Sequence, residues 1–134
     1  MSDELKVNTH KDLDVYKEGM RLAKGVYQVT KQFPKEEIYG ITSQMRRSAV
    51  SIPSNIAEGA ARNSSKEFRQ FINITLGSVS ELDTRVQLSK EFGYFSYPSG
   101  IENQILSVQK MLIGLRKSIT NKTIDHTSQI TYHT

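Results

Sequence analysis

Residues 40–59 read GITSQMRRSAVSIPSNIAEG, and this stretch decides the fold because it repeats small and apolar side chains at helical spacing. Its main stripe recurs every three or four residues, as the buried face of an α-helix does. A second arc lies beside that stripe on a helical wheel, so roughly 200° of the circumference is apolar or small. The stripe is Ile41, Met45, Ala49, Ile52, Ile56 and Ala60, and the second arc is Val50, Pro53, Ala57 and Ala61, with Arg46 among them. We expect one helix over about residues 38–62.

One apolar arc is enough to build the core of a helical bundle, so the second arc needs another explanation. Small residues around a proline suggest that another helix approaches closely at this face. That helix could belong to the same bundle or to a neighbouring subunit, and the pattern favours a subunit interface, because an exposed apolar stripe promotes association.

Pro53 lies inside the predicted helix, where a proline costs about 3 kcal/mol or more. Its ring removes the hydrogen bond to the Ala49 carbonyl and should kink the axis. Nearby serines, Ser48, Ser51 and Ser54, could help to satisfy the freed backbone groups. The alternative is two helices broken at Ser51-Ile52-Pro53.

Helical periodicity recurs three more times, over about residues 12–32, from Ser64 to near Gly93, and from Ile101 to about residue 120. Ser64 with Glu67, and Ser99 with Glu102, fit the capping-box pattern at helix starts. The three predicted core stripes are Leu13, Tyr16, Met20, Ala23, Tyr27 and Thr30; Phe68, Phe71, Ile72, Leu76, Val79, Leu82 and Val86; and Ile101, Ile105, Val108, Leu112, Leu115 and Ile119.

The fold class is therefore all-α. Short links between long helices predict an antiparallel up-and-down four-helix bundle. A seam spaced at about 3.5 residues predicts left-handed packing. We expect a flexible N-terminal segment over residues 1–11, the bundle domain over residues 12–120, and a flexible tail over residues 121–134.

The composition excludes several classes of protein. The chain has 134 residues and no cysteine, which rules out disulfides, thiol catalysis and cysteine metal sites. No stretch approaches the roughly 18 consecutive apolar residues that a membrane span needs. Because the N-terminus is polar and acidic rather than a signal peptide, we expect a cytoplasmic protein.

The inventory of reactive side chains predicts no enzyme activity. The three histidines, His10, His126 and His133, lie outside the predicted helices, so no Ser-His-Asp arrangement is available. No Glu-x-x-His occurs, which excludes a di-iron bundle. No Gly-rich phosphate loop follows a strand. We therefore expect no catalytic residues, cofactor, metal or small-molecule substrate.

Basic residues supply the main hypothesis about binding. Eighteen Lys and Arg against fourteen Asp and Glu give a net charge of +4 and permit contact with a polyanion. The predicted nucleic-acid-binding residues are Arg46, Arg47, Arg62, Lys66 and Arg69. Beside the second arc, Arg46 and Arg47 suit either an interface ion pair or a charged rim. A second basic group, at the end of the fourth helix, fits compensation of the helix dipole.

Residues 40–59 also resemble the signature of a bacterial family, the proteins encoded in the intervening sequences of 23S ribosomal RNA genes. The resemblance extends from Asp12 to about Gly93 and covers roughly three-fifths of the chain. Its motif residues, which we also assign to the interface, are Ser51, Ile52, Pro53, Asn55, Ile56, Ala57, Glu58 and Gly59. The resemblance implies a four-helix bundle that assembles as a homopentamer. The accessory subunit of diversity-generating retroelements, which is similar, binds nucleic acid and a reverse transcriptase.

Two functions remain open on these grounds. The first is a non-enzymatic homo-oligomer that binds ribosomal RNA or another structured nucleic acid. The second is an assembly or adaptor module, such as a reverse-transcriptase accessory protein, whose surface serves another protein and whose positive charge is incidental.

Overall fold

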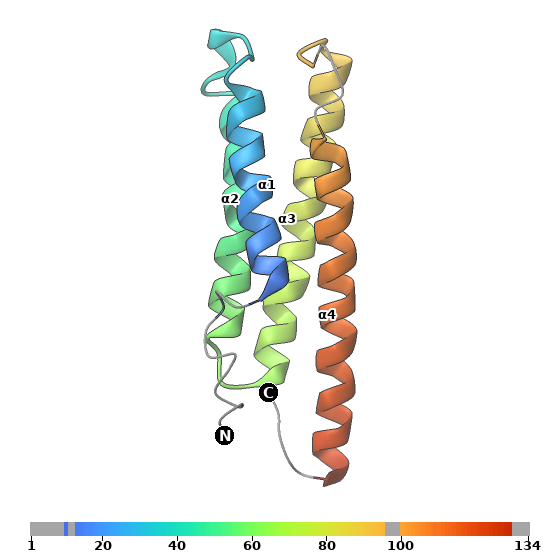
Figure 1. Cartoon of the computed structure of the whole chain (residues 1–134). Helices are drawn as coiled ribbons and strands as arrows, with labels where there is room; N and C mark the ends of the chain where they lie inside the picture. Colours follow the sequence, from blue (N-terminus) through green and yellow to red (C-terminus); the bar gives the residue numbers. More distant parts are fainter. Residues whose placement is uncertain (1–9, 11–12, 96–99, 130–134) are drawn as a thin grey trace.

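The computed structural model shows four long helices that run antiparallel to their neighbours in chain order (Figure 1). They are α1 (Asp14–Thr30), α2 (Ile41–Ala60), α3 (Ser65–Glu91) and α4 (Ile101–Gln129), and a short 3₁₀ turn, η3 (Lys35–Glu37), precedes α2. The structure describes residues 10, 13–95 and 100–129, with the backbone alone for residues 120–129. The predicted all-α four-helix bundle is confirmed, whereas its left-handed twist stays a prediction.

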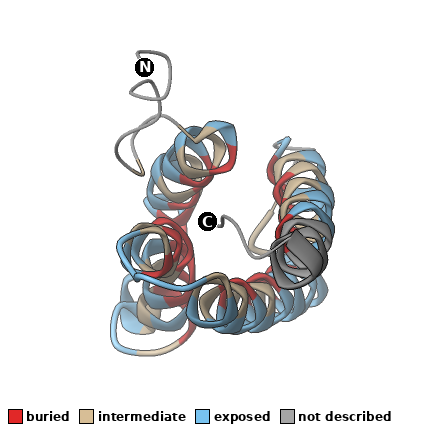
Figure 2. Ribbon diagram, turned by 90° about the horizontal axis from the view of Figure 1, so that it is seen from below, coloured by how far each residue is buried: buried red, intermediate tan, exposed pale blue. Residues whose placement is uncertain are grey.

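Each helix packs against two neighbours, so the four surround one common core. The pair α2 and α3 shares the most extensive contact, and α1 with α4 the least extensive among neighbouring helices. Viewed along the bundle, the buried residues face inward on every helix (Figure 2). The most completely buried large side chains are Leu22, Val26, Met45, Ile52, Ile56, Ile72, Val79, Leu82, Val86, Ile101, Val108 and Leu112.

The core stripe predicted for α1 is confirmed only in part: Thr30 is buried, Leu13, Tyr16 and Ala23 are partly buried and pack against the core, and Met20 and Tyr27 are exposed. The buried residues of α1 are Val15, Gly19, Leu22, Val26 and Thr30, which follow a line about one residue away from the predicted one. On the predicted line, Met20 is 49% exposed and Tyr27 is 42% exposed. The helix carries two parallel apolar stripes, and the one built from smaller aliphatic side chains fits the narrow space between α2 and α4.

Helix α2 runs unbroken through Pro53, so the alternative of two shorter helices is wrong. The predicted stripe is buried from Ile41 to Ile56, and only Ala60 at its end is half-buried. Serine hydroxyls bond backbone carbonyls along the helix: Ser51 to Ser48 at 2.9 Å and Ser54 to Val50 at 2.8 Å. Pro53 itself is buried.

Two glycines let helices approach α2 closely. A Cβ atom added at Gly19 of α1 would lie 3.3 Å from Ile52 Cγ2 and 3.7 Å from Pro53 Cδ. At the other side of α2, a Cβ atom at Gly59 would lie 2.6 Å from the Cβ of Phe71 on α3. Part of the close approach predicted around Pro53 is therefore made by α1 of the same bundle.

The ends of α3 are set by local sequence. Ser64 is its N-cap, and the hydroxyl accepts a hydrogen bond from the Glu67 amide at 3.1 Å, as predicted. Gly93 follows the helix with φ of 81°, and its amide donates to the Lys90 carbonyl while Tyr94 donates to Ser89, both at 2.9 Å. This pattern is a Schellman motif, which explains why α3 ends near Gly93. The predicted cap at Ser99 lies outside the described residues.

Helix α4 continues to Gln129, past the boundary at residue 121 where the sequence predicted a tail. The loss of apolar periodicity after residue 120 therefore does not mark the end of the helix. Adding residues to an existing helix costs far less than starting one. Of the predicted N-terminal segment, residues 1–9 and 11 lie outside the described residues.

Glu37 links two connections at one end of the bundle, the one between α1 and α2 and the one between α3 and α4. Its carboxylate accepts a hydrogen bond of 3.3 Å from the Ile41 amide and one of 2.8 Å from the Tyr94 hydroxyl. The bond to Glu37, with partial burial and the negative charge nearby, raises the pKa of Tyr94 above its ordinary value. One side chain thus links the α1–α2 connection to the α3–α4 connection.

Candidate self-association surface and basic residues

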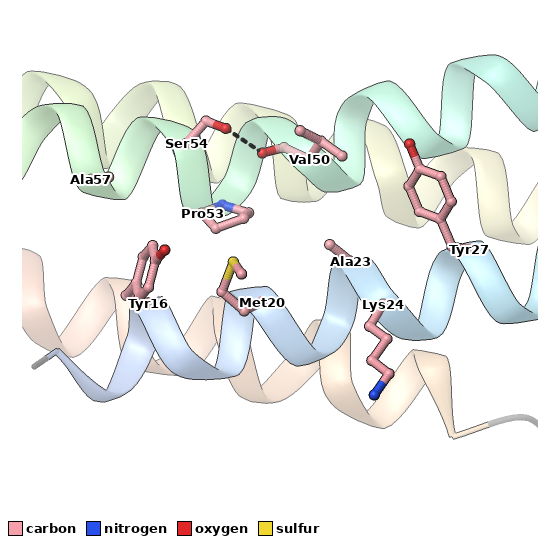
Figure 3. Close-up of a pocket in the computed structure, with 9 residues that line it drawn as sticks. All are labelled: Tyr16, Met20, Ala23, Lys24, Tyr27, Val50, Pro53, Ser54 and Ala57. Carbon is pink, nitrogen blue, oxygen red and sulfur yellow. Dashed lines mark hydrogen bonds between the residues drawn. The ribbon is translucent and has the colours of Figure 1, made fainter. Parts of the chain in front are cut away.

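An open apolar groove runs between α1 and α2 on the outside of the bundle (Figure 3). From α1, Tyr16, Met20 and Ala23 point toward Pro53 of α2. The groove has a volume of about 480 Å³, and Val50 and Ala57 of α2 also line it. Because Val50 is 42% exposed, like Tyr27 opposite, large apolar side chains remain in contact with water along both walls.

The two walls of this groove come from two apolar stripes for which the sequence predicted different roles. The α2 wall is the predicted second arc, Val50, Pro53 and Ala57, whereas Ala61 caps the helix end and does not line the groove. The α1 wall is the stripe assigned by sequence to the core. A signal for its true place was present: this stripe holds two tyrosines, whose hydroxyls seldom suit a narrow dry core.

A second hollow continues the groove toward the α1–α2 connection. Tyr27 and Val50 line both hollows, and Ile38, Arg46 and Arg47 extend the surface. Ile38 is 45% exposed and the neighbouring Tyr39 is 94% exposed. The apolar face defined by these two hollows, called the α1–α2 face below, therefore follows most of the length of α1, with arginines at one end.

Arg46 is held against α1 by two contacts. Its Nε donates to the Thr30 hydroxyl at 2.8 Å, and its guanidinium lies 4.6 Å from the centre of the Tyr27 ring. Thr30 in turn donates to the Val26 carbonyl at 2.8 Å. Arg46 therefore stabilises the α1–α2 pair, at the rim of the apolar face.

Arg62 is engaged in a similar way at the other end of α2. It forms an ion pair of 2.8 Å with Glu58, and its guanidinium lies 4.8 Å from the centre of the Phe71 ring on α3. Both partners of the ion pair are largely exposed, so the Phe71 contact contributes at least as much as the charge pairing.

The five predicted nucleic-acid-binding residues do not form one patch. Arg47 lies near the start of α2 and Arg62 just past its end, about 20 Å apart at 1.5 Å per helical residue. Lys66 is exposed, as is Arg47, and neither forms an ion pair within the described part of the chain. Arg69 is half-buried, and its Nη1 atom is buried with no hydrogen-bond partner among the described residues.

The motif residues of α2 serve packing on all sides of the helix. Ile52 and Ile56 are fully buried, and Ala57 lines the groove. The hydroxyls of Ser51 and Ser78 share a hydrogen bond of 2.7 Å between α2 and α3, and the Asn55 amide donates to the Ser51 carbonyl at 2.9 Å. These motif residues therefore determine how α2 packs against its neighbours.

Among the described residues, no group of three His, Asp or Glu side chains is placed to hold a metal ion. Nor does a helix in this part of the chain combine the length and hydrophobicity that a membrane crossing requires.

Fold and surface together define an antiparallel four-helix bundle with an uncovered apolar face and scattered basic residues. A model of the 23S rRNA-intervening sequence protein family matches residues 11–114, which is most of the chain. The chain belongs to that family. No curated protein matches the sequence.

Proposed function

We propose that this chain is a non-enzymatic, homo-oligomeric bundle protein that binds structured RNA, with five copies in the assembly as the family resemblance implies. The observation that carries the proposal is the uncovered α1–α2 face. The assembly would act in the cytoplasm, on ribosomal or other RNA.

Self-association explains why large apolar side chains stay exposed along one face. Met20, Tyr27 and Val50 are each more than 40% exposed, although the bundle has buried sites for side chains of this size. Extended apolar patches on soluble proteins mark interaction sites. In a ring of identical subunits each face meets a different face of the next copy.

Assembly also explains how a modest charge could bind RNA. A net charge of +4 on one chain becomes +20 on five chains. Repeated weak contacts to phosphates raise the overall affinity through multivalency. Their strength falls steeply with salt, because binding releases counterions from the nucleic acid. The name of the family, which refers to 23S rRNA, agrees with RNA as the polyanion.

Replacing Ala57 with glutamate tests the assembly. Ala57 lines the groove, so the Ala57→Glu variant places a charge where the proposal puts a neighbouring subunit. We expect sedimentation to show a smaller particle and circular dichroism to show unchanged helix content. The matched control is Ser80→Glu, which adds the same charge at an exposed position of α3 outside the groove. An unchanged mass for Ala57→Glu would contradict the proposed interface.

RNA binding is tested separately with nuclease-treated protein and ribosomal RNA fragments at rising salt. We expect binding at about 50 mM salt that weakens as salt increases. Undetectable association at the lowest salt would contradict the RNA part of the proposal and leave the assembly untouched.

A second function is favoured by the internal contacts of Arg46 and Arg62. Arginines held against Tyr27 and Phe71 are less available to phosphates. The same bundle could then serve as an assembly or adaptor module for another protein, such as a reverse transcriptase. A pull-down dominated by one protein and insensitive to nuclease would favour this function over RNA binding.

A further inference from the structure

A second groove lies on the other side of α1, where α1 meets α4. Its polar lining comes from Arg21, Lys24 and Gln28 of α1, Gln32 just after that helix, and Gln104 of α4, and its volume is about 680 Å³. None of the residues lining it is acidic. The groove thus presents positive charge and amide groups, whereas the α1–α2 groove is mainly apolar.

The two helices come close together at the base of this groove. A Cβ atom added at Gly25 would lie 3.0 Å from Ile101 Cδ1 and 3.1 Å from Gln104 Oε1. Glycine at this position therefore lets the amide of Gln104 lie directly beside α1. The polar side chains of the two helices consequently form one surface rather than two separate ridges.

Exposed basic residues recur along α1 and just past its end. Lys17, Lys24 and Lys31 are exposed and recur every seven residues, which places them about 10.5 Å apart. Arg21 lies between the first two and forms an ion pair of 2.8 Å with Glu18. Because Arg21 is 63% exposed, this pair is weak and leaves guanidinium donors available.

This surface is built from largely different side chains than the α1–α2 face. Lys24 stands at the boundary between the two grooves, and its side chain points away from α2 (Figure 3). Gln28, Gln32 and Gln104 line only the α1–α4 groove. A subunit packed on the apolar face can therefore leave these polar groups exposed.

We propose that the α1–α4 groove is the RNA-binding surface of the subunit. The inference rests on the proposed RNA binding and moves its site away from the arginines of α2 and α3. Lys and Arg contact the phosphates, while glutamine amides bond phosphate oxygens and ribose hydroxyls. Without aromatic side chains in the lining, recognition depends on the shape and charge of the RNA backbone.

The test uses two isosteric changes on the same helix. Gln104→Glu adds a carboxylate inside the α1–α4 groove, whereas Gln109→Glu adds one on the side of α4 that faces α3. Each full-length variant is titrated into a fluorescently labelled RNA hairpin and a DNA hairpin of the same sequence. We expect Gln104→Glu to weaken RNA binding about tenfold and Gln109→Glu to change it far less. Sedimentation should show the same particle mass for both variants.

A third variant tests whether Arg21 contacts an RNA phosphate. Arg21→Gln removes one cation, and it should reduce the slope of log affinity against log salt by about 0.9 for each copy that contacts a duplex phosphate. Equal losses for Gln104→Glu and Gln109→Glu would overturn the groove assignment, and equal affinity for the DNA hairpin would overturn the choice of RNA. If wild-type protein bound no RNA, the proposed RNA-binding function itself would fail.

Discussion

Gly59 shows how a single residue sets the distance between two helices. The position of its missing Cβ atom lies 2.6 Å from the Cβ of Phe71, and this part of Phe71 is fixed to the α3 backbone. Arg62 then covers the outer face of the Phe71 ring. The glycine at the end of the motif is therefore required by packing, and no bound ligand is needed to explain it.

The Gly59→Ala variant should accordingly lower the free energy of unfolding by about 1–3 kcal/mol, because α2 and α3 must move apart. Gly77→Ala is the matched control. Gly77 is an exposed residue within α3, and an added Cβ atom there meets nothing within 4 Å. That change should instead stabilise the protein by about 0.5–1 kcal/mol. Urea unfolding of both variants checks the prediction, and equal effects would contradict it.

Tyr94 supplies a prediction about alkaline pH. Its pKa is raised, chiefly by the hydrogen bond to Glu37, so the folded protein holds the phenolic proton more tightly than the unfolded chain does. The resulting stabilisation is complete below the ordinary tyrosine pKa of about 10 and is lost as pH rises through the raised value. The stability advantage of wild type over Tyr94→Phe should therefore disappear in strongly alkaline solution. Absorbance titration should assign a raised pKa to the tyrosine that is missing in the Tyr94→Phe variant.

At the scale of the helix, sequence periodicity predicted three of the four core stripes. For α2, α3 and α4 the apolar residues form one dominant line, and burial follows it. Helix α1 has two lines of similar hydrophobicity, one through Leu22 and Val26 and one through Met20 and Tyr27. Periodicity alone cannot rank them, since the choice depends on the width of the space between α2 and α4.

The effect of Pro53 on α2 could not be predicted from the sequence alone, because it too depends on tertiary packing. A proline inside a helix predicts a kink or a break, and local propensity does not say which. Tertiary packing decides the matter here: buried residues on both sides of the proline belong to one continuous core line, and Gly19 of α1 lets α1 pack closely beside Ile52. A break would remove part of that line from the core.

One hydrogen bond between side chains of α2 and α3 makes a contribution to stability that can be measured. Ser51 and Ser78 bond each other at 2.7 Å, so Ser51→Ala or Ser78→Ala should each cost about 1 kcal/mol. The double variant should cost less than the sum of the two, because each single change removes the same bond. Ser54→Ala is the control, since its hydroxyl bonds only within α2 at an exposed position. Strict additivity in thermal unfolding would contradict a shared bond.

At the scale of the whole molecule, the sequence located the candidate surface only in part. The second arc of α2 was visible as a pattern, but its partner stripe on α1 depends on how two helices turn toward each other. The basic residues were harder to place. The contacts of Arg46 with Tyr27 and Thr30 join residues sixteen or more positions apart, and sequence spacing does not reveal them.

Assembly should make stability depend on protein concentration. If copies associate through the α1–α2 face, unfolding is coupled to dissociation, and the melting temperature rises as the protein is concentrated. The Ala57→Glu variant should lose this dependence, whereas Ser80→Glu should keep it. Calorimetry over a wide range of concentrations checks the prediction, and a melting temperature independent of concentration for wild type would contradict it.

The contact between α1 and α4 closes the circle of helices and is the least extensive contact between neighbouring helices in the described part of the chain. We expect local unfolding of the bundle to begin at this contact, because regions with few packing contacts open most easily. An RNA bound across the α1–α4 contact would touch both helices at once and hold them together. The protein would then be most rigid in its RNA-bound state, and α1 would be the helix that RNA binding stabilises most.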